Sequence, residues 1–383
     1  MTSEHHSQLF SPFALAGLSL RSHVVMAPMT TWSGNDDGTI SDEEVASYRR
    51  RVNGVGLVIT GCTHVSQAGV GFTDEFAAFD DCFIPSLRRL ADAARSGGAP
   101  AMLQIFHAGL KAIPELIPDG IVVGPSDSDG SHGAPVSRAL KPQEILGIVQ
   151  DFAAATRRAI AAGFDGVELH GAHGFLLQNF LSPQFNQRTD EWGGDLENRM
   201  RFALTVTEAV RSVIDAEAGR PFVLGYRVSP EESGERGLRI GDVETLFDRL
   251  IALRVDYIHV SLASVLNTRS IDAGDETIIA RRLADYIAGR VPLIAAGHVR
   301  TPLEAEQAIA TGLSLVAVGK GLVINPDWVE LAMTGEADRR ETALRPSQIA
   351  SLAIPNKLWT AIKARPGWFD VTDTEVVSRE QQA

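Results

Sequence analysis

Eight short apolar runs alternate with amphipathic helical segments along the 383-residue chain, and this alternation limits the fold more than any other feature. The runs are rich in Val, Ile and Leu and largely apolar on both faces, which is typical of buried parallel strands. The predicted strands are residues 24–27, 55–60, 101–105, 166–169, 222–227, 257–261, 293–296 and 315–318.

Helical patterns fill the intervals between these strands. They are predicted near residues 42–52, 85–96, 142–162, 196–216, 243–253, 275–290 and 302–310. Helix-start signatures are expected at Asp42, at Asp242, and at Thr301 with Pro302 and Glu304.

Eight strands alternating with helices predict an α/β fold, the (β/α)8 TIM barrel. A doubly wound sheet is the alternative, but it fits less well because no glycine fingerprint opens a helix after the first strand. No linker rich in Gly, Ser and Pro interrupts the pattern. We therefore predict a single domain over residues 1–383, with a core of about 8–370 and a polar C-terminal tail, 371–383, that frays.

The charge balance argues against some partners. The chain has 48 Asp and Glu against 35 Lys and Arg, a formal net charge of −13. Nucleic-acid binding depends on clustered basic residues, so nucleic acid is not expected as a partner. The one dense basic run, Arg49 to Arg51, falls in a helical pattern and is predicted to form a solvated helix face.

The marks of a membrane or secreted protein are not found in the sequence. No apolar run approaches the roughly 20 residues of a membrane span, and the first residues show no signal-peptide pattern. Cys62 and Cys82 are the only cysteines and are predicted to be reduced thiols. These features predict a cytoplasmic protein without a membrane partner.

Two predicted connections are long for a compact domain: residues 106–141 after the third strand and 170–195 after the fourth. Loops of this length are usually functional, and both follow strand C-termini, where barrel active sites lie. The apolar, aromatic segment 350–369 is expected to dock on the barrel or on a neighbour. Its part 359–369 suggests a homodimer interface.

Polar residues and glycines gather where the predicted strands end. They are Pro28-Met29-Thr30, Thr60-Gly61-Cys62, Gln104 with His107, His170 with His173, Arg227, Ser261, Gly297-His298 and Gly319-Lys320. Singly, each has a structural explanation, such as a buried ion pair or a tight turn. Together, around one barrel mouth, they indicate a functional site.

Gly297, Gly319 and Lys320 follow the seventh and eighth strands, where barrels often bind phosphate. Glycines let backbone N–H groups approach an anion closely, and Lys320 adds a positive charge. Tight turns alone are the alternative explanation of these glycines.

A planar ring that accepts hydride needs donors where negative charge develops. Arg227, Gln104 and His170 supply such groups at one edge, and the Thr30 hydroxyl serves another. His170 and His173 are three residues apart, so a zinc site, two buried structural histidines and a clamp for an anion or carbonyl are all considered. No further metal ligands of the right kind mark the other strand ends, so no metal is predicted.

Several motifs together resemble one known family. The stretch around the histidines reads HGAHGFLL from His170, FLSP from Phe180 and WGGDLENR from Trp192. The others follow in order: MAPMT, QIFHAG, GYRVSPEE, AAGHVRTPLEAEQAI and VAVGKGLVINPDW, at strands one, three, five, seven and eight. Over roughly residues 8–370 the chain resembles the Old Yellow Enzyme family of flavin-dependent ene-reductases, closest to its bacterial NADH:flavin oxidoreductase branch.

The resemblance implies an FMN-dependent enzyme that takes electrons from NADPH or NADH and reduces a small-molecule substrate. It implies cofactor binding by Ala27, Pro28, Met29, Thr30, Cys62, Gln104, His170, Arg227, Gly297, Gly319 and Lys320. It implies that His170 and His173 hold the substrate oxygen as catalytic residues, together with Thr30. Trp32, Phe106 and Phe175 would line the substrate pocket.

Some positions depart from the family's pattern. Phe175 stands where the family commonly has the Tyr that protonates the substrate α-carbon, and Trp32 stands where some bacterial members have another Tyr. Lys320 replaces the usual Arg. None of the four tyrosines falls on an obvious donor position. Water, or a residue of the 106–141 loop such as His132, then delivers the proton.

The resulting hypothesis is an FMN-dependent NAD(P)H oxidoreductase that reduces activated alkenes, such as α,β-unsaturated carbonyls and nitroalkenes, by hydride transfer. Because Phe175 has no hydroxyl, the first alternative is a flavoprotein that acts mainly on quinone or nitro acceptors. A second is a flavin-binding protein that only transfers electrons or senses redox state. The third, from another class, is a metal-dependent barrel hydrolase that uses His170 and His173.

Overall fold

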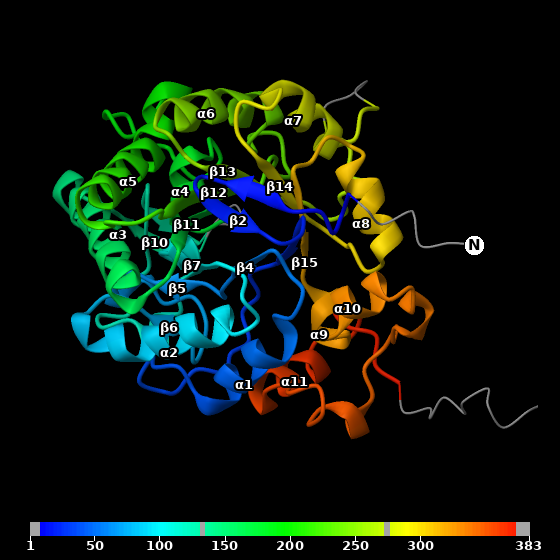
Figure 1. Cartoon of the computed structure of the whole chain (residues 1–383). Coiled ribbons are helices and arrows are strands. Elements are labelled where there is room, and N and C mark those ends of the chain that lie inside the picture. Colours follow the sequence, from blue (N-terminus) through cyan, green and yellow to red (C-terminus); the bar gives the residue numbers. More distant parts are fainter. Residues whose placement is uncertain (1–7, 131–134, 272–275, 373–383) are drawn as a thin grey trace, which may run out of the picture.

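Eight parallel strands close into a barrel, which confirms the predicted (β/α)8 fold (Figure 1). The computed structural model describes residues 8–130, 135–271 and 276–372. The barrel strands are β3(Val24–Met26), β4(Leu57–Ile59), β7(Ala101–Phe106), β11(Gly166–Gly171), β12(Val223–Val228), β13(Tyr257–Ser261), β14(Leu293–Ala296) and β15(Leu315–Val318). Strand β15 pairs with β3, and this pairing closes the barrel.

Helices alternate with these strands and cover the outside of the barrel. They are α1(Asp42–Arg51), α2(Ile84–Arg95), α3(Pro142–Ala162), α5(Leu196–Glu217), α6(Ile240–Ala252), α7(Ile279–Ile287), α8(Pro302–Ile309), α9(Lys320–Ile324) and α10(Trp328–Met333). The predicted cap at Thr301, with Glu304 bonding back, is confirmed. The other two helix starts were wrong: Ser41 caps α1, and α6 begins at Ile240, so that Asp242 lies inside it.

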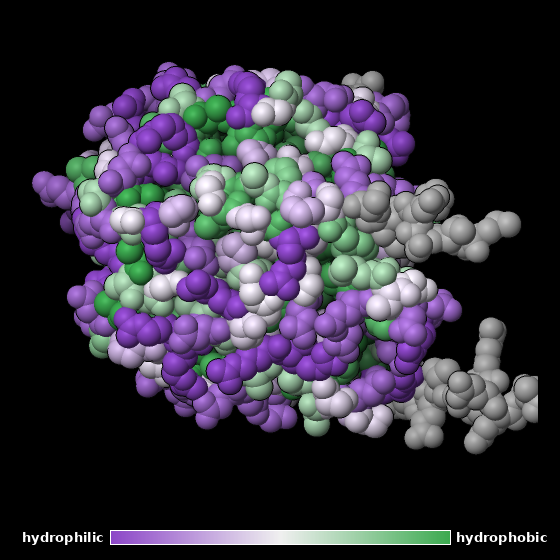
Figure 2. Space-filling view, viewed as in Figure 1, coloured by the Kyte–Doolittle hydropathy of each residue, from purple (hydrophilic) through white to green (hydrophobic). Residues whose placement is uncertain are grey.

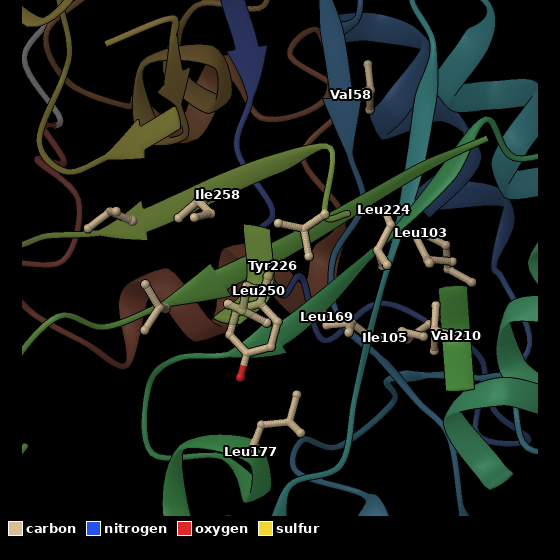
Figure 3. Packing of buried hydrophobic residues seen from close by; sticks show 14 of the residues in the cluster. Val58, Leu103, Ile105, Leu169, Leu177, Val210, Leu224, Tyr226, Leu250 and Ile258 are labelled. Carbon is tan, nitrogen blue, oxygen red and sulfur yellow. The ribbon is translucent and has the colours of Figure 1, made fainter. Parts of the chain in front are cut away.

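The strands bury side chains on both faces. Outward-pointing residues such as Leu103, Leu169 and Tyr226 pack beneath the helices with Val210 of α5 and Leu250 of α6 (Figure 3). This outer layer is the main hydrophobic core, and it holds the helices against the barrel.

A hairpin closes the N-terminal end of the barrel. Strands β1(Phe13–Leu15) and β2(Leu18–Leu20) pair antiparallel, and Leu15 and Leu20 pack against inward-facing barrel residues such as Met102, Tyr257 and Ile294. In Figure 1 this blue hairpin crosses the barrel end that faces the viewer, and Figure 2 shows apolar residues near the middle of that face with hydrophilic ones around them.

The two long connections contain secondary structure. The one after β7 holds η3(Gly109–Lys111), η4(Pro114–Leu116) and a small sheet of β8(Val123–Gly124), β9(Ser128–Asp129) and β10(Val136–Ala139). The one after β11 holds α4(Leu176–Leu181). The short strands β5(Thr63–His64) and β6(Phe76–Ala77) continue the sheet beside β7.

The C-terminal segment docks on its own barrel. Helix α11(Asn356–Lys363) contributes Leu358 and Ile362 to a cluster with Val323 and Ile324, against which Met29 and Trp32 pack. A homodimer interface formed by this segment stays a prediction.

The basic run in α1 does not form a solvated face, contrary to the prediction. Arg51 is only 2% exposed and donates to the carbonyl oxygen of Leu352 at 2.8 Å. Nη2 of Arg50 donates to Asp327 at 2.6 Å. The C-terminal segment thus covers part of α1, a contact between distant parts of the chain that a helical pattern does not predict.

Both cysteines are free thiols, as predicted, with Cys62 buried and Cys82 exposed. Within the three described ranges, no helix is both long enough and apolar enough to cross a membrane.

Candidate active site

Strand alternation turns five polar side chains into the barrel near the C-terminal ends of the strands. Gln104 of β7 lies in register with Glu168 of β11, and His170 of β11 with Arg227 of β12, which pairs in turn with His259 of β13. All five are buried. Residues in register on parallel strands share a face, so Glu168 and His259, which were not predicted as site residues, join the three that were.

Glu168 is the centre of this buried group. Its carboxylate accepts hydrogen bonds from Nε2 of Gln104 at 2.6 Å, from the Tyr257 hydroxyl at 2.9 Å and from Nδ1 of His259 at 2.9 Å. Burial by itself would raise the pKa of Glu168, but the charges of His259 and Arg227 and the hydrogen bonds lower it below its usual value. Glu168 therefore stays ionised and fixes the Gln104 amide, whose oxygen is left as an acceptor.

His170 and His173 lie beside one another, with ring centres 5.0 Å apart. The backbone N–H of Ala172 donates to Nδ1 of His170 at 3.3 Å, so the proton of the neutral His170 ring is on Nε2. Burial lowers the pKa of His170 well below its ordinary value. Burial, together with the charges of Arg227 and Lys111, lowers the pKa of His173 to about 3. Both imidazoles are therefore neutral hydrogen-bonding groups at neutral pH.

Ser261 links Arg227 to this histidine pair. Nη2 of Arg227 donates to Oγ of Ser261 at 3.0 Å, and the same oxygen lies 2.7 Å from Nε2 of His173. Nε of Arg227 is buried and finds no acceptor within the described part of the chain. A buried donor without a partner is costly, so this nitrogen fits a ligand that brings an acceptor.

A cavity of about 430 Å³ opens beside these groups, a size typical of sites for small ligands and cofactors. It brings together eight of the predicted site residues: Ala27, Pro28, Met29, His173, Arg227, Gly297, Gly319 and Lys320.

The remaining predicted site residues surround this cavity. Gln104 and His170 lie in the buried group described above. Oγ1 of Thr30 lies 3.4 Å from Sγ of Cys62, and Cys62 packs with Phe106 and Phe175. His132, the proposed proton donor, lies outside the described residues.

One end of the cavity is suited to an anion. Lys320 and Arg300 both line it. Arg300 pairs with Asp370 at 2.6 Å, yet its buried Nε finds no partner in the described ranges. His298 holds a left-handed backbone with φ of 52°, which is rare outside glycine and often seen at functional sites. Arg300 was not predicted, although its position three residues after Gly297 in the connection that follows β14 was a usable signal.

Gly297 has to be glycine for the backbone to run beside this anion end. A Cβ built on Gly297 would lie 2.5 Å from the carbonyl oxygen of Leu262, so Gly297→Ala displaces one of the two segments. We expect the variant to bind FMN at least about tenfold more weakly, a loss of about 1.4 kcal/mol, as measured by fluorescence titration of the apoprotein. Gly147→Ala in α3 meets nothing within 4 Å, and its affinity for FMN should not change.

An aromatic wall stands next to the histidine pair. Phe175 lies 4.8 Å from the His170 ring and 4.8 Å from Phe106, so two of the predicted pocket residues meet. Phe72 was not predicted, and it joins Trp32, at 5.8 Å, to Phe106 and Phe175. The wall is apolar and carries no hydroxyl group.

Glu75 and His64 hold the loop that carries Phe72. Nδ1 of His64 lies 2.6 Å from Glu75, whose other oxygen accepts hydrogen bonds from the backbone N–H groups of Gly71 and Phe72 at 3.2 and 2.9 Å. Both side chains are buried. The pair fixes the backbone at Phe72 and thereby the position of its ring in the wall.

A second buried carboxyl lies behind Thr30. Glu44 accepts a hydrogen bond from the Thr31 hydroxyl at 2.8 Å and borders a small cavity shared with Met29, Thr30 and Tyr48. Burial raises the pKa of Glu44 to about 7, although the Thr31 hydrogen bond and the charge of Arg51 act to lower it. Glu44 is therefore partly protonated at neutral pH.

The raised pKa of Glu44 predicts a change of stability with pH. Between its ordinary pKa of 4.5 and the folded value of about 7, the folded state holds a proton that the unfolded chain has lost, so this contribution to stability disappears as the pH rises. Glu44→Gln keeps the neutral form at every pH. Relative to the parent, it should gain about 2–3 kcal/mol between pH 4.5 and pH 8 in urea unfolding experiments. An equal difference at both pH values would contradict this prediction.

The alternative of a metal site finds no support in the arrangement of side chains. In the part of the chain that the structure describes, no three His, Cys, Asp or Glu side chains are grouped as metal ligands. His170 and His173 have Arg227 and Phe175 as neighbours instead of carboxylates.

Comparison with known proteins places this geometry in a family. A family model described as NADH:flavin oxidoreductase / NADH oxidase matches residues 8–339. The chain is 39% identical over 370 residues to the probable NADH-dependent flavin oxidoreductase YqiG of Bacillus subtilis (strain 168), covering 96% of this chain and 99% of that protein.

Solved structures agree with this result. Morphinone reductase in complex with tetrahydroNAD superimposes with a TM-score of 0.77 at 26% identity, over 92% of this chain and 97% of that one. An old yellow enzyme homologue from Zymomonas mobilis, NCR, superimposes with a TM-score of 0.73 at 25% identity, over 86% and 93%.

Proposed function

The chain belongs to the NADH:flavin oxidoreductase / NADH oxidase family, which includes Old Yellow Enzyme, and from this premise we propose that it reduces electrophilic alkenes such as α,β-unsaturated carbonyls and nitroalkenes. It is an oxidoreductase that uses FMN and NADH or NADPH. Its substrate and the roles of its site residues are the subject of the proposal.

The site has the chemistry that FMN requires. The unpartnered Nε of Arg227 and the oxygen of the Gln104 amide offer a donor and an acceptor for the polar edge of the ring. Gly297, Gly319 and Lys320, joined by Arg300, would hold the phosphate. When bound, FMN supplies a two-electron carrier that accepts hydride from NAD(P)H and passes it to the substrate.

His170 and His173 would bind and polarise the substrate. Because both imidazoles are neutral, each has one N–H, and that of His170 is on Nε2. These N–H groups can donate to a carbonyl or nitro oxygen, on which negative charge grows as hydride reaches the β-carbon. Removing one such donor typically slows a reaction by about 10²–10³-fold.

The apolar wall would exclude water from the reacting carbon atoms. Phe106 and Phe175 are buried, and Phe72 completes the wall beside them. An apolar pocket with two hydrogen-bond donors at one side is suited to a small, flat, electron-poor molecule. The observation that carries the proposal is this pair of neutral imidazoles, 5.0 Å apart, next to an aromatic wall.

A spectroscopic experiment tests the proposal. The purified protein should show flavin absorbance that is bleached anaerobically by NADH or NADPH and restored by cyclohexenone or a maleimide. Protein that is bleached but not reoxidised by any alkene or nitroalkene would refute the proposed substrate class and leave the family assignment intact.

The composition of the wall favours a second candidate function. Phe175 has no hydroxyl, so an enzyme acting mainly on quinone or nitro acceptors would need no proton donor for carbon. Under this second function, Phe175→Tyr should strongly raise turnover of cyclohexenone and leave turnover of a quinone unchanged.

A further inference from the structure

The aromatic wall lacks an acid, and no tyrosine supplies one. Tyr48 lies behind the site and accepts a hydrogen bond from the backbone N–H of Gly61. Tyr257 donates to Glu168, and Tyr286 donates to Asp248 at the surface. Tyr226 points outward into the core between strands and helices. Burial strongly raises the pKa of the Cys62 thiol, so the thiol also does not serve as an acid.

Lys111 is a cation beside this wall. It is the last residue of η3, directly after β7, and its Nζ lies 5.7 Å from the centre of the Phe175 ring. The side chain runs over the turn between His173 and Phe175, where a Cβ built on Gly174 would lie 3.3 Å from Cε and 3.6 Å from Nζ of Lys111. Glycine at 174 therefore gives the lysine room, and its φ of 71° also favours glycine.

The ammonium of Lys111 has no partner of opposite charge. Across residues 8–130, 135–271 and 276–372, neither a carboxylate nor a carbonyl oxygen bonds to its Nζ. The other titratable groups close enough to be affected by its charge are His170 and His173, which are both neutral. Burial lowers the pKa of Lys111, which makes it a stronger acid than a solvated lysine.

We propose that Lys111 is the proton donor to the substrate α-carbon, in place of the hydroxyl that Phe175 lacks. This proposal rests on the proposed alkene reductase function. It extends the catalytic group from the histidine pair, which holds the oxygen, to a cation on the neighbouring connection.

The step balances in atoms and electrons. A hydride that originates from NAD(P)H forms the new C–H bond at the β-carbon, and the π bond of the alkene breaks. A proton leaves Nζ of Lys111 and forms the C–H bond at the α-carbon. The alkene gains two electrons, the reduced cofactor loses two, and the neutral amine regains its proton from solvent, to which the Lys111 side chain is exposed.

The test compares two acceptors in anaerobic stopped-flow experiments on the FMN-loaded enzyme. An enone needs protonation at carbon, whereas a nitroalkene leaves as a stable nitronate after hydride transfer. Lys111→Met should slow reoxidation of reduced enzyme by cyclohexenone about 10²–10⁴-fold, the usual effect of losing a general acid. Reoxidation by a nitroalkene should change less than about threefold, because that step needs no proton at carbon.

Further measurements separate proton donation from binding. The affinity of oxidised enzyme for an unreactive ketone should be the same in Lys111→Met and the parent. In D2O the parent should deuterate the α-carbon on one face, and the variant on both. The parent's enone rate should fall with rising pH as the ammonium deprotonates, and Lys111→Met should lack this fall.

Two further variants sharpen the result. Lys363→Met removes a lysine that also lies 5.7 Å from an aromatic ring, that of Trp359, and should behave as the parent. Phe175→Tyr should raise the enone rate only slightly. An enone rate preserved in Lys111→Met, equal losses with both acceptors, or a large gain in Phe175→Tyr would overturn the proposal. A parent inactive with both acceptors would instead refute the proposed function.

Discussion

Replacing His170 by alanine is expected to lower kcat/KM for cyclohexenone about 10²–10³-fold. The loss should appear in the half-reaction with the alkene, because the donor at Nε2 of His170 acts where negative charge develops on the substrate oxygen. The ring lies in a 3% exposed position, so little water can replace the missing donor. Stopped-flow reoxidation of the reduced enzyme measures the step directly.

The matched control is His173→Asn, which keeps an N–H donor at the second position of the pair. It should lose less than about tenfold, since a neutral hydrogen bond is replaced by another of similar strength. His170 is also predicted to contact the cofactor, so FMN content must be compared by absorbance before rates are. Equal rates for His170→Ala and the parent at full FMN occupancy would contradict the assigned role.

Replacing Glu168 by leucine is expected to lower the free energy of unfolding by about 3–5 kcal/mol, the usual result of removing one member of a buried ion pair. The carboxylate is 0% exposed and accepts three hydrogen bonds. Leucine would leave those three donors unpaired and the charge of Arg227 uncompensated. Denaturant unfolding of parent and variant, both with saturating FMN, measures the difference.

Two variants calibrate this measurement. Glu168→Gln keeps the shape but offers one acceptor oxygen in place of two, and should cost about 1–3 kcal/mol. Glu217→Gln breaks the exposed pair with Arg157, whose atoms are 2.7 Å apart, and should change stability by less than about 1 kcal/mol. A Glu168→Leu variant as stable as Glu217→Gln would show that Glu168 does not hold the network together.

Much of the barrel could be predicted because its signals are local. Strands β13, β14 and β15 have the predicted bounds, and α3 does as well. Strand β11 extends two residues beyond its predicted end, to Gly171. The extension includes His170 because this histidine is buried like its neighbours, so a polar residue did not mark the end of the strand.

The candidate site could be predicted in part, for a related reason. Glycines, histidines and basic residues at strand ends are unusual enough to be recognised singly, and the barrel then places all strand ends at one mouth. Phe72, Arg300 and Lys111 gave no such signal, because an aromatic or basic residue in a connection is ordinary until its neighbours are known.

The sequence by itself determined the order of strands and helices and the residues that end each strand, because hydrophobic periodicity and glycine positions act over a few neighbouring residues. Only the tertiary structure decided that Glu168 binds His259, 91 residues away, that Arg51 is buried under Leu352, and that Lys111 reaches Phe175. Such contacts form when the barrel closes and the C-terminal segment docks. Their energies depend on burial and on distances between side chains, which no local pattern contains.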